Sequence, residues 1–202
     1  MSEAESSNMQ ITFARWISVI GHPFLLMPLL TGIIAYHVLP PKQALIAELV
    51  SLGVVIIPAG LYTLFRVRRG TWGDLDVSNQ RERSQFYGIL LPLLFVIVII
   101  AWFADVPRSI PLGSLAIIAL VASALVLNNW IKVSLHTGFG VFVALTLFLI
   151  APSLALIALL LALLIAWSRV VRGRHTTREV VLGGTMGCIV GGAFLATLLY
   201  LI

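Results

Sequence analysis

Charged residues are scarce in this sequence. Only 10% of its 202 residues are Asp, Glu, Lys or Arg, and 60% are hydrophobic. A soluble domain of this size carries about a quarter charged residues. The low charge and the mean hydropathy of +1.07 exclude an ordinary soluble protein and predict an integral membrane protein.

Cysteine is almost absent as well. Cys188 is the single cysteine and lies within an apolar run, so an intrachain disulfide is impossible and redox chemistry is not expected. The first residues are polar and include Glu3 and Glu5, without the basic segment that precedes the apolar core of a cleavable signal. We therefore expect the first hydrophobic run to be a retained membrane span.

Apolar runs are abundant. Several reach or approach the roughly 17–25 residues that a transmembrane helix needs. The fifth is short, and we expect it to begin at the membrane surface. The runs predict an all-α fold, a polytopic membrane helical bundle of about six or seven transmembrane helices. They cover residues 16–39, 44–65, 86–104, 110–131, 135–150, 153–170 and 179–202.

The polar segments between the runs predict the topology. We expect one integral membrane domain over residues 1–202, with a polar N-terminal segment, 1–14, and one long polar loop, 66–85. Alternation of the spans places the N-terminus, this loop and segments 131–136 and 168–179 on one side. Every Lys and Arg except Lys42 and Arg108 then lies on that side. The positive-inside rule predicts that this is the cytoplasmic face of a cell membrane.

The net charge of +5 does not indicate a nucleic-acid partner. The arginines that produce it lie at the ends of apolar runs rather than on a soluble surface. We therefore expect no nucleic acid to bind. The sequence predicts no particular oligomeric state.

The segment Ser168–Glu179, with the sequence SRVVRGRHTTRE, is the most polar part of the C-terminal half. If it continues the preceding helix, His175 and Glu179 lie on one face, although Gly173 makes a local break an alternative. In both cases the carboxylate is close enough to accept a proton from the imidazole, which would raise the basicity of its other nitrogen. Together with the surrounding arginines, this pair suggests phosphoryl chemistry. The alternative is a basic interfacial loop that anchors two helices.

A second candidate segment runs from Lys132 to His136. In a helix these two residues are i, i+4 neighbours, and the hydroxyl of Ser134 lies between them. An ammonium, a hydroxyl and an imidazole suit binding a phosphate and protonating a leaving oxygen. The alternative is a lysine that extends to the membrane surface beside a histidine at a helix end.

The polar loop is the third candidate. Arg83 adjoins the next span and could bind a phosphate with two parallel hydrogen bonds. Asp74 and Asp76 could ligate Mg²⁺, which proteins bind through one or two carboxylates together with substrate phosphate. The alternative is a charged loop that is simply solvated.

Two other features indicate structure rather than chemistry. His22, which precedes Pro23 in the first run, is expected to be structural or interfacial. In the last run, Gly183, Gly187 and Gly191 recur every four residues. This spacing lets helix backbones approach closely in lipid, so we expect a tightly packed helix that holds the preceding polar segment.

Taken together, these segments resemble the signature of the type-2 phosphatidic acid phosphatase superfamily. That signature reads K-x6-R-P, P-S-G-H and S-R-x5-H-x3-D. Its third part is the most specific element and is present from Ser168-Arg169 through His175 to Glu179. Only the final acid differs, and it remains a carboxylate. The resemblance extends from the region of Asp74 to the C-terminus.

The other two parts match less well. The second is present as Val133-Ser134-Leu135-His136, with the proline and the glycine replaced. In the first, Asp76 occupies the lysine position, Arg83 the arginine position and Ser84 the proline position. Lys132 could supply the missing ammonium group.

The resemblance implies a metal-independent phosphatase with a helical-bundle fold and no cofactor. His175 would attack phosphorus and form a phosphohistidine, and Glu179 would orient and activate it. His136 would protonate the departing oxygen. The groups that would bind the phosphoryl oxygens are Arg83, Lys132, Ser134 and Arg169.

The location of these residues suggests the substrate. At the surface end of a bundle they can be reached by a lipid head group while its acyl or prenyl chain stays in the bilayer. We therefore expect the partner to be a membrane lipid phosphate, such as phosphatidic acid, phosphatidylglycerol phosphate, or a polyprenyl phosphate or diphosphate. Two alternatives remain: a Mg²⁺-dependent enzyme similar to prenyltransferases, and a non-catalytic protein that binds anionic lipids.

Overall fold

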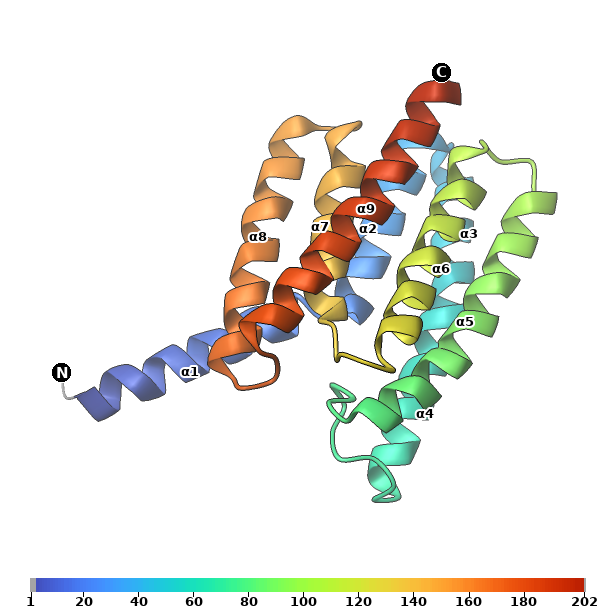
Figure 1. The fold of residues 1–202 in the computed structure, drawn as a ribbon. Helices are drawn as coiled ribbons and strands as arrows, with labels where there is room; N and C mark the ends of the chain where they lie inside the picture. The colour runs from blue at the N-terminus through green and yellow to red at the C-terminus, as the bar shows by residue number, and fades with distance from the viewer. Residues whose placement is uncertain (1–2, 202) are drawn as a thin grey trace. The chain divides into compact units, whose positions relative to one another are not determined.

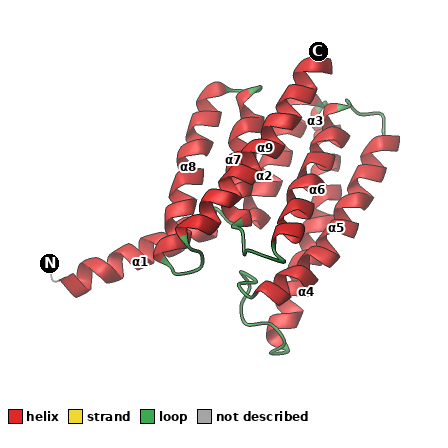
Figure 2. Cartoon of the chain, viewed as in Figure 1, coloured by secondary structure: helices red, strands yellow, loops and turns green. Residues whose placement is uncertain are grey.

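The computed structural model describes residues 3–201. These residues form α-helices joined by loops, with no strand among them (Figure 2). The predicted all-α fold is therefore confirmed. The helices are α1 Glu3–Ile20, α2 Pro23–Val38, α3 Pro41–Ser51, α4 Ile57–Arg68, α5 Gln80–Phe103, α6 Ser109–Leu127, α7 Leu135–Phe148, α8 Pro152–Val171 and α9 Thr177–Leu201, and a π-helical turn, Leu52–Ile56, joins α3 to α4.

Several helices have the length and composition of membrane spans. Within the described residues, five are long and apolar enough to cross a membrane: Pro41–Arg68, α5, α6, α8 and α9. A sixth candidate is the pair Asn8–Ile20 and Pro23–Val38, which is bent by 45°. Helix α7 is shorter than these, as expected for the fifth run. The polytopic bundle is thus confirmed.

The first hydrophobic run differs from the prediction of one span over residues 16–39. Helix α1 ends at Ile20 and α2 begins at Pro23. A residue that precedes proline is disfavoured in the helical region, and proline is well suited to the first turn of a helix. His22 therefore lies in a break between two helices.

The chain divides into two compact units. The first contains the described residues up to Leu26 together with Lys132–Leu195, and the second contains Met27–Ile131 with the short segment after Leu195. The expectation of a single integral membrane domain stays a prediction.

In the first unit, α7 packs closely against both α8 and α9 (Figure 1). A Cβ added at Gly183 would collide with the carbonyl oxygen of Ser134, and one at Gly187 with that of Gly138. From the side of α7, a Cβ added at Gly138 would lie only 2.8 Å from the carbonyl oxygen of Gly183. Helices α7 and α9 thus meet backbone to backbone, which confirms the close packing predicted from the glycine spacing.

In the second unit, α5 and α6 lie side by side (Figure 1). Asn128, which follows α6, donates from Nδ2 to the carbonyl oxygen of Gln80 at 2.8 Å and to Oγ of Ser84 at 3.0 Å. Asn79 caps α5, because its side chain accepts a hydrogen bond from the Arg81 amide at 2.9 Å. Helix α5 therefore begins at Gln80, and the polar loop is shorter than the predicted 66–85.

Candidate functional site

The polar segment between α8 and α9 is a tight turn. Helix α8 ends at Val171, and Gly173 adopts a left-handed conformation, with φ of 62°. The backbone amides of Arg174 and His175 both donate to the carbonyl oxygen of Arg169, at 3.0 and 3.1 Å. Such bonds satisfy carbonyl groups left at a helix end. The continuous helix considered for this segment is therefore wrong, and the break at Gly173 is the correct alternative.

Helix α9 starts with a reciprocal cap. The amide of Glu179 donates to Oγ1 of Thr176 at 3.3 Å, and the amide of Thr176 donates to Oε2 of Glu179 at 3.2 Å. This is the capping box that a threonine followed three residues later by a glutamate forms. It holds the Glu179 carboxylate beside the turn that carries His175.

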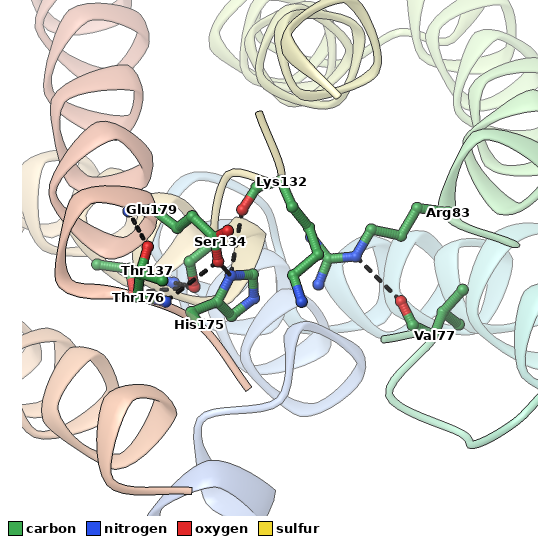
Figure 3. Close-up of polar contacts among 8 residues, drawn as sticks. All are labelled: Val77, Arg83, Lys132, Ser134, Thr137, His175, Thr176 and Glu179. Carbon is green, nitrogen blue, oxygen red and sulfur yellow. Dashed lines mark hydrogen bonds and ion pairs between the residues drawn. The ribbon is translucent and has the colours of Figure 1, made fainter. Parts of the chain in front are cut away.

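His175 and Glu179 form the central pair of the site (Figure 3). Nδ1 of His175 lies 2.8 Å from Oε2 of Glu179 and 3.2 Å from the carbonyl oxygen of Lys132. Both neighbours are acceptors, so in the neutral ring the proton resides on Nδ1 and the lone pair on Nε2. The side chain of His175 is fully buried, and its two contacts through Nδ1 fix the orientation of the ring. The predicted proximity of the two side chains is confirmed.

The segment before α7 is bonded to the same pair. The amide of Ser134 donates to the carbonyl oxygen of Glu179 at 3.1 Å, and Oγ of Ser134 accepts from the amide and the hydroxyl of Thr137, at 3.4 and 3.1 Å. Ser134 is therefore the N-cap of α7, which begins at Leu135. The helical i, i+4 pairing predicted for Lys132 and His136 is wrong, because Lys132 lies outside the helix. Its carbonyl group faces His175 instead.

His136 lies in the first turn of α7 and is buried. Its ring packs against that of His22, with centroids 4.9 Å apart and planes at 89°. His22 in turn accepts a hydrogen bond at Nδ1 from the amide of Phe24, at 3.2 Å. Sequence reasoning assigned no chemistry to His22. The available signal was its place directly before a proline at a helix break.

Arg169 is completely buried at the end of α8. Its Nη1 donates to Oγ of Ser18 in α1 at 2.7 Å. Ser168, the neighbouring residue of the third motif, bonds its own helix, with Oγ donating to the carbonyl oxygen of Ile165 at 2.8 Å. The contact between Ser18 and Arg169 was not foreseen, since these residues are 151 positions apart in sequence.

Arg83 belongs to the second unit. It is buried in the first turn of α5, where its Nε donates to the carbonyl oxygen of Val77 at 3.0 Å (Figure 3). The loop before it contains an internal side-chain hydrogen bond, in which Oγ of Ser78 donates to Oδ1 of Asp74 at 3.2 Å. The first unit thus brings together Lys132, Ser134, His136, Arg169, His175 and Glu179, whereas the approach of Arg83 to them stays a prediction.

The first unit therefore holds a set of groups suited to phosphoryl transfer. It combines an imidazole oriented by a carboxylate, a second buried imidazole and a buried guanidinium. A nucleophile with an adjacent orienting group is the usual arrangement for covalent catalysis, and guanidinium groups match the oxygens of a phosphoryl group.

Comparison with known proteins supports this interpretation. Searches of curated proteins and of solved structures gave no match. The family model of the PAP2 superfamily matches residues 60–202, which is more than half of the chain and includes both motif segments of the first unit. The protein therefore belongs to the PAP2 superfamily, the type-2 phosphatidic acid phosphatase superfamily.

Proposed function

We propose that the protein is a membrane phosphatase that hydrolyses the phosphate ester of a lipid through a phosphohistidine on His175. Membership of the PAP2 superfamily supports phosphatase-type activity in general. The observation that carries the finer proposal is the 2.8 Å contact between Nδ1 of His175 and the Glu179 carboxylate. It leaves the nucleophilic lone pair on Nε2.

In the first step, Nε2 of His175 attacks phosphorus and the bond between phosphorus and the lipid oxygen breaks. The protonated His136 gives its proton to that oxygen, so the lipid leaves as an alcohol. The ring of His175, with Nδ1 protonated and Nε2 phosphorylated, is then cationic. The carboxylate of Glu179 stabilises this charge.

In the second step, a water molecule attacks the phosphohistidine. Neutral His136 accepts a proton from the water, the bond between phosphorus and Nε2 breaks, and inorganic phosphate is released. His136 is then protonated again and His175 is neutral, as at the start. Two displacements replace one difficult hydrolysis.

The phosphoryl oxygens are bound by Arg169, Lys132 and Ser134, with Arg83 as a fourth group implied by the family signature. Ser134 accepts two hydrogen bonds from Thr137, so its own proton is available for a phosphoryl oxygen. The cationic side chains supply the charge stabilisation that such transition states require. The mechanism needs no metal ion or cofactor.

The substrate is a lipid because the site lies at the ends of apolar helices. The pair His175 and Glu179 lies where α8 ends and α9 begins, and both helices have the composition of membrane spans. A head group can reach this end while its apolar chain remains in the bilayer. Phosphatidic acid, phosphatidylglycerol phosphate, and polyprenyl phosphate or diphosphate are the candidates, on the cytoplasmic face of a cell membrane.

A substrate panel on the purified protein in detergent tests this proposal. We expect release of inorganic phosphate from at least one of these lipids, unchanged in EDTA. His175→Ala should reduce it to background, while His37→Ala, at an exposed histidine near the end of α2, should leave it intact. Absence of release from every lipid contradicts the proposal. A strict Mg²⁺ requirement favours a metal-dependent enzyme instead.

A further inference from the structure

The N-terminal helix and the break that follows it lie outside the residues that match the family model, yet they belong to the same compact unit as the motif residues. We propose that this segment is a positioning part of the active site, in which His22 orients His136 and Ser18 orients Arg169. The proposal rests on the phosphatase function proposed above, because it concerns residues that act through two members of that site.

The segment is docked on α8 by several contacts. The ring of Phe13 in α1 lies 6.0 Å from that of Trp167, measured between centroids. At the end of α1, a Cβ added at Gly21 would collide with the side chain of Ile165, which would have to move. The chain therefore leaves α1 directly beside the end of α8 that carries Arg169.

His22 is held in one tautomer by the start of α2. The amide of Phe24 donates to Nδ1 of His22 at 3.2 Å, so Nδ1 carries the lone pair and the proton of the neutral ring resides on Nε2. The amides of Leu25 and Leu26 both donate to the His22 carbonyl oxygen, at 2.8 and 3.0 Å. Backbone contacts at two points thus determine where the ring lies.

The fixed ring of His22 contacts His136. The centroids are 4.9 Å apart with perpendicular planes, and one nitrogen of each ring lies within 4.8 Å of the other. Perpendicular aromatic rings at this distance attract each other beyond simple burial. Because His136 is the proposed proton donor, its ring must be aimed at the leaving oxygen, and His22 restricts its rotation.

Ser18 has the corresponding role for Arg169. The guanidinium is fully buried, and one of its amino groups donates to Oγ of Ser18 at 2.7 Å. Ser18 is itself buried, at 1% exposure. A bond of this kind in a dry environment orients a planar guanidinium strongly. The Arg169 cation is therefore already oriented when the phosphoryl group binds.

The two contacts predict different kinetic signatures. A proton donor matters for a lipid alcohol, which is a poor leaving group, and much less for p-nitrophenol, which leaves readily as an anion. His22→Asn should therefore lower kcat/KM for the lipid phosphate roughly tenfold, a fraction of what general acid catalysis supplies. It should leave kcat/KM for p-nitrophenyl phosphate nearly unchanged, because kcat/KM reports only the first displacement, in which His136 gives its proton to the leaving oxygen. Asparagine is a good cap, so the start of α2 is retained.

Ser18→Ala should affect both substrates alike, because Arg169 binds the phosphoryl group that they share. We expect KM to rise roughly tenfold for each, in line with the loss of a hydrogen bond to a charged group. Ser18→Thr retains the hydroxyl and should recover most of the activity. Thr12→Ala is the matched control in α1, since that hydroxyl is exposed and donates to its own helix, at the Asn8 carbonyl oxygen.

A double-substitution cycle completes the test. If His22 acts through His136, His22→Asn should have no further effect on kcat/KM in a His136→Ala background. The inference would be overturned by equal losses of kcat/KM on both substrates for His22→Asn, by additive losses in the cycle, or by full activity of both His22→Asn and Ser18→Ala. Failure of the phosphatase proposal is distinguishable, because the unmodified protein would then release no phosphate or would not depend on His175.

Discussion

Two polar connections of this chain look similar in sequence but differ in structure: the turn 172–176 in the first unit and the loop 69–79 in the second. In the turn, backbone amides are bonded to Arg169 and Glu179, and the His175 ring is buried between two acceptors. In the loop, the side chains bond the loop and its adjacent helices. Trp72 donates from Nε1 to the Gln85 side chain at 3.1 Å, for example.

The difference distinguishes a loop that only joins two helices from a turn that also carries the proposed catalytic pair. The loop is stabilised by its own polar and aromatic side chains, and the guanidinium of Arg66 lies 5.4 Å from the Trp72 ring centroid. The turn is stabilised by backbone hydrogen bonds to the end of α8 and by the capping box between Thr176 and Glu179. The same bonds place the His175 imidazole against the Glu179 carboxylate, and an oriented pair of titratable groups is a mark of a catalytic site.

The largest expected effect comes from Glu179, whose carboxylate contacts the turn and is compared with Glu82 beside the loop. Glu179→Gln retains a hydrogen-bond acceptor for His175 but removes the negative charge that stabilises the phosphorylated ring. By analogy with the loss of a charge beside a catalytic histidine, turnover should fall by roughly 10²–10⁴. The measurement is steady-state phosphate release from the lipid substrate.

Glu82→Gln is its counterpart in the loop region. Glu82 accepts hydrogen bonds from the Gly73 amide at 3.2 and 3.4 Å, and glutamine retains one of these acceptors. Glu82 is half-buried, but turnover should stay within about twofold of the unmodified protein, because glutamine can still accept a hydrogen bond from the Gly73 amide. Equal losses for Glu179→Gln and Glu82→Gln would remove the distinction between the two connections.

The next effect concerns the helix that supports the turn. Gly187→Ala places a methyl group against the Gly138 carbonyl oxygen, so α7 and α9 must move apart. Overpacking of this kind costs about 1–3 kcal/mol of stability. We expect a lower Tm in detergent together with reduced turnover, since the bond between Ser134 and Glu179 lies at the same helix crossing.

Gly192→Ala provides the control for this crossing. Gly192 lies on the same helix, but a Cβ there meets nothing within 4 Å. Alanine has the better helix propensity, so the Tm should be unchanged or slightly higher and turnover unaffected. A fall in Tm as large as that of Gly187→Ala would contradict the close approach of α7 and α9.

The smallest expected effect comes from alanine substitutions at the two left-handed glycines, one in each connection. Gly70 and Gly173 follow the ends of α4 and α8 with φ of 67° and 62°, and both have open space where a Cβ would lie. Alanine at either position should therefore cost about 1 kcal/mol through backbone strain alone. Thermal unfolding should show similar losses for the two variants.

Turnover should distinguish them. Gly173→Ala strains the turn that carries His175, so we expect turnover to fall several-fold, while Gly70→Ala leaves it unchanged. A misplacement of about 1 Å is enough to reduce catalysis substantially. Loss of turnover in Gly70→Ala but not in Gly173→Ala would reverse the roles of the turn and the loop.

Local rules explain which sequence predictions succeeded. Span lengths and the four-residue glycine spacing predicted the helical fold and the crossing of α7 and α9. The spacing of His175 and Glu179 predicted their contact, because three intervening residues bring them together in a helix or beside a capping box. The pairing of Lys132 with His136 failed for a local reason too: Ser134 is a strong N-cap, so the helix begins after Lys132.

The sequence by itself determined that this is a membrane bundle and which residues form the His175 and Glu179 pair, since both depend on composition and on spacings of a few residues. Only the tertiary structure decided the partners of Arg169 and His136. Ser18 and His22 reach them because α1 packs on α8 and the chain breaks at Gly21. Contacts between residues more than a hundred positions apart arise from helix packing, and spacings of a few residues do not predict them.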